Sequence, residues 1–242
     1  MTQKSIPDPH QQRLQFRRRL VAWFRRHGRD LPWRRTRDPY QILVSEVMLQ
    51  QTQVARVTEY WPRFLGRFPT MHALAAAHPD RVREAWDGLG YYRRAANLHL
   101  LAREVVQGHD GQLPRDVAAL RALPGIGAYT AGAVASFAWE AAEPAVDTNV
   151  ARVLRRAFHP RVRKGVTGER TLWRTAQALV PRAGLAAWTT NQALMELGAL
   201  VCTARVMHCD RCPVRQVCRT AAQERGAARK SSTVRSRSRG ST

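Results

Sequence analysis

Apolar residues recur along most of the chain at intervals of three and four, as Leu14, Leu20, Val21 and Phe24 illustrate. This spacing places apolar side chains on one face of a helix, whereas the alternation typical of strands is almost absent. The pattern therefore predicts an all-α fold with short connections between its helices. Helices are predicted over residues 11–27, 39–50, 53–67, 80–87, 92–107, 115–122, 130–138, 148–158, 169–180 and 188–200.

Residues at the ends of the first two predicted helices support this assignment. Gly28 is expected to end the first helix, and Asp38 followed by Pro39 is typical of an N-cap with proline at the first helical position. Beyond Arg219 apolar residues become rare, so residues 219–242 are predicted to be a disordered basic tail.

The charge of the chain points to a polyanionic partner. Its 242 residues include 40 Lys and Arg but 18 Asp and Glu, which gives a formal charge of +22. Nucleic acid and an anionic membrane surface both fit such an excess. Arginine far outnumbers lysine, and it is well suited to bidentate phosphate contacts, although genome base composition also favours arginine in some organisms.

The chain has no feature that would send it through or into a membrane. No run of 18 or more apolar residues is present, and the N-terminal segment has no apolar core of a secretory signal. We therefore expect no membrane partner and a monomer in the cytoplasm, associated with the nucleoid. All four cysteines lie between Cys202 and Cys218, which in a reducing compartment suggests a metal site before disulfides.

Glu46 is an acidic residue within the apolar run of the second predicted helix. Ile42 lies four residues before it and Leu49 three residues after it, so the carboxyl projects from an apolar face. A carboxyl shielded from water holds its proton more tightly, which is the state that a general acid needs near neutral pH. Pairing with one of the many arginines is the structural alternative.

The stretch LPGIGAYTAGAV, residues 123–134, predicts a tight turn that leads directly into a helix. Gly125 and Gly127 form the turn after Pro124, and the helix is expected to begin near Thr130. Backbone N–H groups at such a turn can bind a phosphate. An ordinary connection between two helices would have the same pattern.

Asp147 precedes a predicted helix that contains Val150, Val153 and Leu154. Capping alone explains an aspartate at this position, and the helix dipole would keep it ionised. An ionised Asp147 facing a protonated Glu46 would form an acid and anion pair of the kind that glycosidases use.

Cys202, Cys209, Cys212 and Cys218 are spaced as C-x6-C-x2-C-x5-C. Four thiolates within so short a segment form a closed ligand set that suits a structural zinc ion or a 4Fe–4S cluster. Zinc sites usually pair two close doublets of ligands, and this segment has one, which favours the cluster slightly.

Taken in order, several motifs resemble those of the helix-hairpin-helix DNA glycosylase superfamily, and within it the MutY-type adenine DNA glycosylases. The resemblance extends from about residue 15 to Cys218, and SEVMLQQTQ and the cysteine spacing are its most specific parts. The matching motifs are LPWR at 31–34, SEVMLQQTQV at 45–54, GLGYYRRAANL at 88–98, LPGIGAYTAGAV, VDTNV, NQALMELGALVC at 191–202 and the cysteine segment.

The resemblance implies two helical lobes with mismatched double-stranded DNA bound in the cleft between them. Residues 29–142 would form a six-helix barrel that contains the helix-hairpin-helix. Residues 1–28 and 143–218 would form a lobe that carries a 4Fe–4S cluster held by the four cysteines. Residues 219–242 would remain outside both lobes as the basic tail.

The resemblance also implies roles for individual residues. Glu46 would protonate the departing adenine and then handle water, while Asp147 would stabilise the oxocarbenium-like sugar. Gln51 and Tyr91 would enter the base stack. The other implied residues are Tyr129 and Asn149 in the catalytic group, Trp33, Arg34, Gln192 and Glu196 near the flipped base, and Gln50, Gly125 and Gly127 among the DNA-binding residues.

Tyr129 bears on the type of reaction. In the endonuclease III enzymes of this superfamily, a lysine at the matching position forms a Schiff base and cleaves the strand. Here the residue is tyrosine, and no lysine lies between Lys4 and Lys164. The resemblance therefore implies a monofunctional glycosylase with little or no strand cleavage.

Two other functions remain open at the level of sequence. MutY-type enzymes carry a further C-terminal domain that reads 8-oxoguanine, and this sequence ends 24 residues after Cys218, so the choice between guanine and 8-oxoguanine is undetermined. Short relatives include glycosylases for thymine or uracil opposite guanine. A DNA-binding lesion sensor without catalytic activity is the third possibility, but binding alone would require neither Glu46 nor Asp147.

Overall fold

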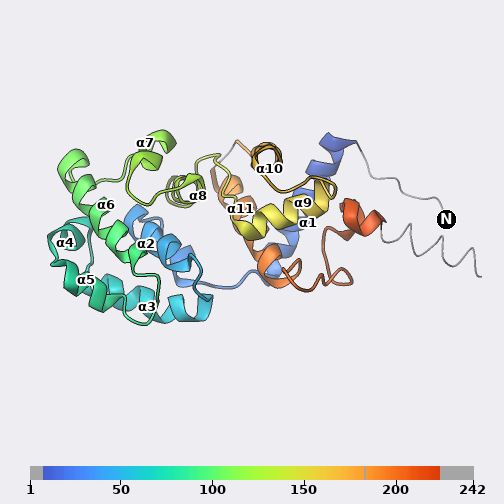
Figure 1. The fold of residues 1–242 in the computed structure, drawn as a ribbon. Coiled ribbons are helices and arrows are strands. Elements are labelled where there is room, and N and C mark those ends of the chain that lie inside the picture. The colour runs from blue at the N-terminus through green and yellow to red at the C-terminus, as the bar shows by residue number, and fades with distance from the viewer. Residues whose placement is uncertain (1–7, 183, 224–242) are drawn as a thin grey trace, which may run out of the picture. The chain divides into compact units, whose positions relative to one another are not determined.

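The computed structural model describes residues 8–182 and 184–223 (Figure 1). Over these residues the regular elements are helices, apart from one isolated bridge between Cys202 and Met207, so the all-α prediction is confirmed. The helices are α1 (Pro9–His27), η1 (Pro32–Arg34), α2 (Pro39–Leu49), α3 (Val54–Arg67), α4 (Met71–Ala76), α5 (Pro79–Ala85), α6 (Arg93–His109), α7 (Val117–Ala122), α8 (Ala128–Trp139), α9 (Thr148–Phe158), α10 (Val166–Leu179), α11 (Gly184–Leu200) and η2 (Arg215–Val217).

The helix ends follow the local signals of the sequence. The carboxylate of Asp38 accepts hydrogen bonds from the N–H groups of Tyr40 and Gln41, which caps α2. Gly28 is the C-cap of α1. Asp147 caps α9 by accepting from the N–H group of Val150 at 2.6 Å. Because each cap satisfies backbone groups that the helix itself leaves unpaired, these short signals determine where the helices begin and end.

Some elements differ from the prediction. Helix α4 was not predicted, because its six residues are too few to show a periodic pattern. Helix α11 begins at Gly184, four residues earlier than predicted. The predicted disordered tail is wrong over residues 219–223, which are helical, because Ala221 is buried and lines a cavity with the cysteines. Residues 224–242 of that tail lie outside the described residues.

The chain divides into two compact units. One unit, called here the barrel unit, comprises residues 30–145 and 182–188. The other, called the cysteine unit, comprises the described residues up to Arg29 together with residues 146–181 and 189–223. We propose that they correspond to the barrel lobe and the cluster lobe of the sequence analysis, with residues 182–188 added to the barrel.

Two apolar helices, α2 and α8, pack against each other in the barrel unit (Figure 1). Every residue from Ile42 to Met48 on α2 and from Thr130 to Ala138 on α8 is buried. The backbone of the segment that follows α8 comes very close to the helix at Gly132. An added Cβ there would lie 2.2 Å from the carbonyl oxygen of Pro144. A helix buried on all sides in this way belongs to the interior of its unit.

Helices α1, α9, α10 and α11 supply the core of the cysteine unit. Phe16 and Leu20 of α1 pack in one cluster with apolar residues of the other three helices, such as Leu154 of α9. Cys202, Cys212 and Cys218 pack against the same cluster. The cysteine segment is therefore attached to the core of its unit rather than to its surface.

Among the helices that the structure describes, none has both the length and the apolar character needed to cross a bilayer.

Candidate functional site

Glu46 lies in the interior of the barrel unit, and its side chain is in contact with Tyr129. The residue is 3% exposed, and its Oε2 atom accepts a hydrogen bond from the Tyr129 hydroxyl. Next to this pair, the Gln50 amide lies 3.5 Å from the Thr130 hydroxyl. The structure thus brings together Glu46 of α2 and Tyr129 at the start of α8, two members of the predicted catalytic group.

The buried position of Glu46 follows from the sequence of α2. Its neighbours Ser45, Val47 and Met48 are also buried, because this helix contacts other elements on all its faces. Removal of water from a carboxyl group disfavours its charged form. A hydroxyl within hydrogen-bonding distance can either donate to the carboxylate or accept from the carboxylic acid, so the Tyr129 hydroxyl is compatible with both protonation states.

Gln51 and Tyr91, the two residues predicted to enter the base stack, are both exposed in the barrel unit. Each has a backbone conformation that non-glycine residues rarely adopt, with φ of 58° for Gln51 and 49° for Tyr91. Tyr91 is 62% exposed, although tyrosine is a large and partly apolar side chain. Exposed side chains on strained backbone are more common at functional sites than elsewhere.

The predicted hairpin is present between α7 and α8. Gly125 has φ of 76°, and an added Cβ there would lie 2.9 Å from the Cβ of Asn97 on α6, so this position requires glycine. Gly127 is the N-cap of α8 and provides no capping side chain. The start of a helix whose N-cap has no side chain can bind an anion such as a DNA phosphate through its backbone N–H groups.

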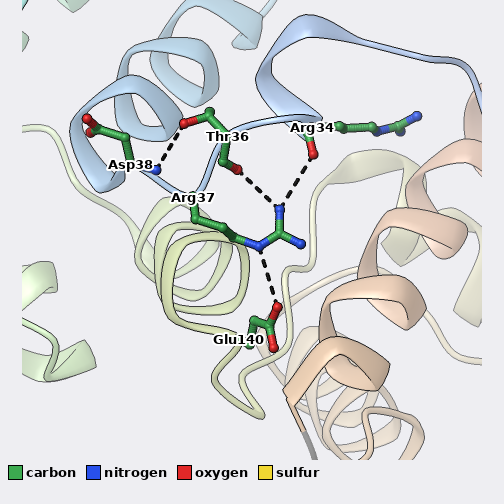
Figure 2. A network of polar contacts seen from close by, with 5 residues as sticks. All are labelled: Arg34, Thr36, Arg37, Asp38 and Glu140. Carbon is green, nitrogen blue, oxygen red and sulfur yellow. Dashed lines mark hydrogen bonds and ion pairs between the residues drawn. The ribbon is translucent and has the colours of Figure 1, made fainter.

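Trp33 and Arg34 lie on η1, and Arg37 anchors the segment that follows them (Figure 2). The Arg37 guanidinium donates to the carbonyl oxygens of Arg34, at 3.5 Å, and Thr36, at 3.2 Å. It also pairs with Glu140 at the end of α8, with Nε and Oε1 3.5 Å apart. Trp33 itself is buried and packs edge-on against Trp61 of α3.

In the cysteine unit, Asp147 and Asn149 form one hydrogen-bonded group with Arg152. The Asn149 amide donates to Oδ2 of Asp147 at 2.8 Å, while its own oxygen accepts from Arg152 at 2.7 Å. Arg152 also donates to the carbonyl oxygen of Cys202 at 2.9 Å. Burial lowers the pKa of the Arg152 guanidinium, and the repulsion between Arg152 and Arg156 lowers it further. Because Asn149 bonds to Oδ2 and Arg152 holds Asn149, the orientation of Asp147 is determined by more than its capping bond.

Gln192 and Glu196 lie four residues apart on α11 and are both buried. Glu196 has no solvent exposure, and its carboxylate pairs with Arg29, whose Nε lies 2.7 Å from Oε1 and whose Nη2 lies 3.1 Å from Oε2. The backbone N–H group of Arg29 adds a further bond to Oε1. This bidentate ion pair offsets part of the cost of burying the Glu196 side chain and fixes its direction.

The four cysteines line one cavity in the cysteine unit. Arg156 lies at its edge, where Nη1 is 3.3 Å from the Cys202 sulfur. Burial raises the pKa of the Cys212 thiol to about 12 and also raises that of Cys218. The residues that share this cavity with Cys202, Cys209, Cys212 and Cys218 include Ala157, Leu197, Val201, His208, Val214 and Ala221.

The four cysteines that line this cavity are a donor set that suits a metal centre held by thiolates. Among the described residues, no three His, Cys, Asp or Glu side chains are arranged to hold one metal ion. A tetrahedral zinc site needs all four sulfurs within about 2.3 Å of one atom. A 4Fe–4S cluster is larger, and four cysteines that line one apolar cavity are compatible with it once their thiols have lost their protons.

The predicted site residues thus fall into two groups. The barrel unit contains Trp33, Arg34, Glu46, Gln50, Gln51, Tyr91, Tyr129 and the hairpin glycines. The cysteine unit contains Asp147, Asn149, Gln192, Glu196 and the cysteines. Arg29, Arg94 and Arg152 were missed, since one arginine among so many has no distinguishing sequence signal. The predicted meeting of Glu46 and Asp147 stays a prediction.

The family of the chain follows from its sequence. Residues 44–177 match the HhH-GPD superfamily of base excision DNA repair proteins. That match covers more than half of the chain and includes the second half of α2, with Glu46, the hairpin and Asp147. The chain therefore belongs to the HhH-GPD superfamily of base excision DNA repair proteins.

Individual members of known function are similar to this chain. The chain is 50% identical over 196 residues to the adenine DNA glycosylase of Mycolicibacterium smegmatis, which covers 81% of this chain and 66% of that protein. It is 45% identical to the adenine DNA glycosylase of Homo sapiens over 84% of this chain and 39% of that one. The chain thus spans about two thirds of the bacterial relative and about two fifths of the human one.

Solved structures share the fold. A thermostable thymine-DNA glycosylase superposes with a TM-score of 0.81 at 28% identity, covering 90% of this chain and all of that one. An endonuclease III trapped as a covalent intermediate with DNA gives a TM-score of 0.75 at 26% identity, covering 89% of this chain and 98% of that one.

Proposed function

We propose that the chain is an adenine-specific DNA N-glycosylase that removes adenine mispaired with guanine or 8-oxoguanine from duplex DNA. The observation that carries this proposal is the buried Glu46 carboxyl and its hydrogen bond to the Tyr129 hydroxyl. The similarity to adenine DNA glycosylases supports adenine as the base that is released.

The proposed reaction is a hydrolysis. Glu46 donates its proton to a ring nitrogen of adenine, and the glycosidic bond breaks with its electron pair leaving on the base. The sugar becomes positively charged, and the Asp147 carboxylate stabilises this charge. A water oxygen then adds to C1′ of the sugar while a proton of that water returns to Glu46. The products are free adenine and an abasic site.

The remaining residues bind and orient the substrate in this proposal. The hairpin at Gly125 and Gly127 holds phosphates, with Gln50 beside it, and Gln51 and Tyr91 fill the space that the flipped adenine leaves. Tyr129 orients Glu46, and Asn149 orients Asp147. Trp33, Arg34, Gln192 and Glu196 lie near the extruded base in this proposal, and Arg29 fixes the direction of the Glu196 carboxylate.

Strand cleavage is not expected from this site. A Schiff base with the opened sugar requires an amine, and residue 129, which contacts Glu46, is a tyrosine. We therefore propose a monofunctional enzyme that leaves the abasic strand intact.

A base-release assay tests the proposed function. The substrates are duplexes with A opposite 8-oxoguanine, A opposite G, T opposite G and U opposite G, and the readout is the free base. Release of adenine is expected from the first two. The fold likeness to a thymine-DNA glycosylase makes thymine the second candidate, and release of pyrimidines alone would establish it.

Replacement of Glu46 separates an enzyme from a lesion sensor. Glu46→Gln keeps the shape and hydrogen-bonding capacity of the side chain but removes the proton donor. We expect base release to be lost and DNA affinity to be largely retained. A fully active variant would show that another group is the acid.

We also propose that Cys202, Cys209, Cys212 and Cys218 hold a 4Fe–4S cluster. The bound cluster would supply no chemistry to base release; it would connect the cysteine segment to the core of its unit. The purified protein should be brown and contain about four iron atoms per chain. A colourless protein with one zinc atom would contradict this assignment.

A further inference from the structure

Gln51 and Tyr91 are both exposed and are called here the wedge residues, because they are proposed to enter the base stack. They lie in different segments of the barrel unit. Gln51 follows the C-cap of α2, and Tyr91 precedes α6. Both have positive φ, as do Asp110 and Glu140, but those two are themselves helix C-caps. A left-handed conformation at two non-glycine residues persists where surrounding contacts hold it.

One guanidinium group contacts the backbone immediately before each wedge residue. Nη1 of Arg94 donates to the carbonyl oxygen of Gln50 at 2.5 Å, and Nη2 donates to that of Gly90 at 3.2 Å. Nη2 also donates to the Leu89 carbonyl at 3.3 Å and to the Thr52 hydroxyl at 3.0 Å. The same side chain is therefore bonded on both sides of Gln51 and to both residues before Tyr91.

Arg94 also satisfies the open end of α2. Its Nη1 lies 2.9 Å from the Val47 carbonyl oxygen and 2.8 Å from that of Met48. These carbonyls belong to the last turn of the helix, where no backbone donor remains for them. Because Glu46 precedes Val47 on the same helix, the guanidinium connects the helix of the proposed acid to both wedge segments.

Aromatic rings complete the surroundings of this guanidinium. Its central carbon lies 5.5 Å from the ring centre of Trp86 and 5.6 Å from that of Tyr91. The Trp86 indole N–H donates to the Gly90 carbonyl at 3.2 Å, which gives that oxygen a second donor. Arg94 is thus in contact with the ring of one wedge residue as well as with the backbone of both segments.

We infer that Arg94 is a positioning residue that holds Gln51 and Tyr91 in one fixed geometry, so that both enter the base stack as a single rigid unit. This inference rests on the proposed function, since it assumes that the protein extrudes a base. A planar guanidinium can address two segments at once through its two Nη groups, whereas a lysine ammonium is a single point.

Substitutions at two neighbouring arginines test this role. Arg94→Lys keeps the charge but not the fork, and Arg94→Gln removes both. Arg93→Gln is the matched control, because Arg93 is exposed on the first turn of the same helix and its loss changes the net charge equally. Thermal unfolding of each variant shows whether it is folded, and Arg94→Lys decides the matter if Arg94→Gln is not.

Base release is measured in single turnover at saturating protein with A opposite G. We expect both Arg94 variants to be at least about tenfold slower than the wild type, because misplacement by about 1 Å can cost a factor of 100. Arg93→Gln should remain within about threefold of wild type. A folded Arg94→Lys protein with the wild-type rate would overturn the inference.

A fluorescence signal separates positioning from a general structural role. A 2-aminopurine placed next to the mismatched adenine becomes brighter when the stack is opened, and Glu46→Gln prevents chemistry during the measurement. Arg94→Lys in that background should reduce the increase at saturating protein, whereas Arg93→Gln should leave it unchanged. A slower base release with an undiminished fluorescence increase would also overturn the inference.

A double-mutant comparison tests whether Arg94 acts through the wedge residues. If it does, Arg94→Lys should slow base release far less in a Gln51→Ala, Tyr91→Ala protein than in the wild type. Equal slowing in both would contradict the inference. Failure of the proposed function looks different, because the wild type itself would then release no adenine from the A opposite G duplex, whereas failure of this inference leaves the wild-type rate intact and affects the Arg94 comparisons alone.

Discussion

Asp147 has an observed capping role and a proposed catalytic role, and a single substitution can separate the two. Its Oδ1 atom caps α9 through the N–H group of Val150, and its Oδ2 atom accepts from Asn149. Asparagine at this position retains an oxygen for the cap but carries no charge. The proposed sugar cation would therefore lose its stabilising anion while the helix kept its N-terminus.

We predict that Asp147→Asn lowers the rate of base release by a factor of at least about 100, because a developing charge loses its electrostatic partner. The free energy of unfolding should change by less than about 1 kcal/mol, because asparagine is an equally good N-cap. Single-turnover kinetics and urea unfolding measure the two effects. The control is Asp116→Asn at the N-cap of α7, which should leave the rate unchanged. Equal rates for Asp147→Asn and wild type would reduce Asp147 to a capping residue.

We expect His159 to make the stability of the protein depend on pH. Burial lowers the pKa of this histidine, and the nearby charge of Arg219 lowers it further. The unfolded chain therefore binds the proton more tightly than the folded protein. The free energy of unfolding should decrease as the pH falls from about 6.5 towards the folded pKa, and the contribution is present in full above about 6.5.

We predict that His159→Gln removes this part of the pH dependence. Glutamine does not titrate and can still bond to the Thr175 hydroxyl, which lies 2.8 Å from Nε2 of the histidine. Urea unfolding of both proteins between pH 5 and pH 8 gives the difference. A difference between wild type and variant that does not change with pH would disprove the assignment. Because the ring is partly exposed, the effect should be small.

At the scale of elements, the barrel unit depends on the close approach between α8 and the segment that follows it. An added Cβ at Gly132 would lie 2.2 Å from the Pro144 carbonyl oxygen, and this backbone atom cannot rotate away. Gly108 on α6 is a helical glycine with nothing within 4 Å of the same added atom. Both glycines are helical, Gly132 in the middle of α8 and Gly108 in the last turn of α6, and they differ in what surrounds the added atom.

We predict opposite effects of alanine at these two positions. Gly132→Ala should destabilise the protein by at least about 1–3 kcal/mol, because overpacking forces the backbone apart. Gly108→Ala should stabilise it by up to about 1 kcal/mol, because alanine loses less conformational entropy in a helix. Denaturant midpoints measure both effects. A neutral Gly132→Ala would show that α8 can move away from residue 144 without cost.

At the scale of the whole molecule, we expect the charge of +22 to govern the proposed binding to DNA. Basic side chains that neutralise phosphates release counterions, so affinity should fall steeply as salt increases. If the chain contacts about six to ten phosphates, we predict a decrease of 10³ to 10⁵ in affinity between about 50 and 200 mM salt.

Titration of a fluorescent duplex with the Glu46→Gln protein measures this dependence without turnover. The slope should be the same for matched and mismatched duplexes, because phosphate contacts do not read sequence. A slope near zero would show that the basic residues face something other than DNA.

The local features of this protein were predictable from the sequence. Helical periodicity, the caps Asp38 and Asp147, and the turn at Gly125 depend on residues within one or two turns of each other, and the structure contains them as predicted. The motif order also predicted the family, which the match over residues 44–177 confirms. Helix α4 escaped because six residues are too short for a pattern.

The contacts that orient the site were decided by tertiary structure. Arg29 bonds to Glu196 across 167 positions of the chain, and Arg94 bonds to Gln50 across 44. No periodicity or spacing connects residues so far apart, and each of these arginines is one basic residue among many. The sequence therefore determined which chemical groups this protein carries. Packing decided that Arg29 holds the Glu196 carboxylate and that Arg94 holds the backbone at Gln50, because these contacts depend on distances that exist only after the helices have packed.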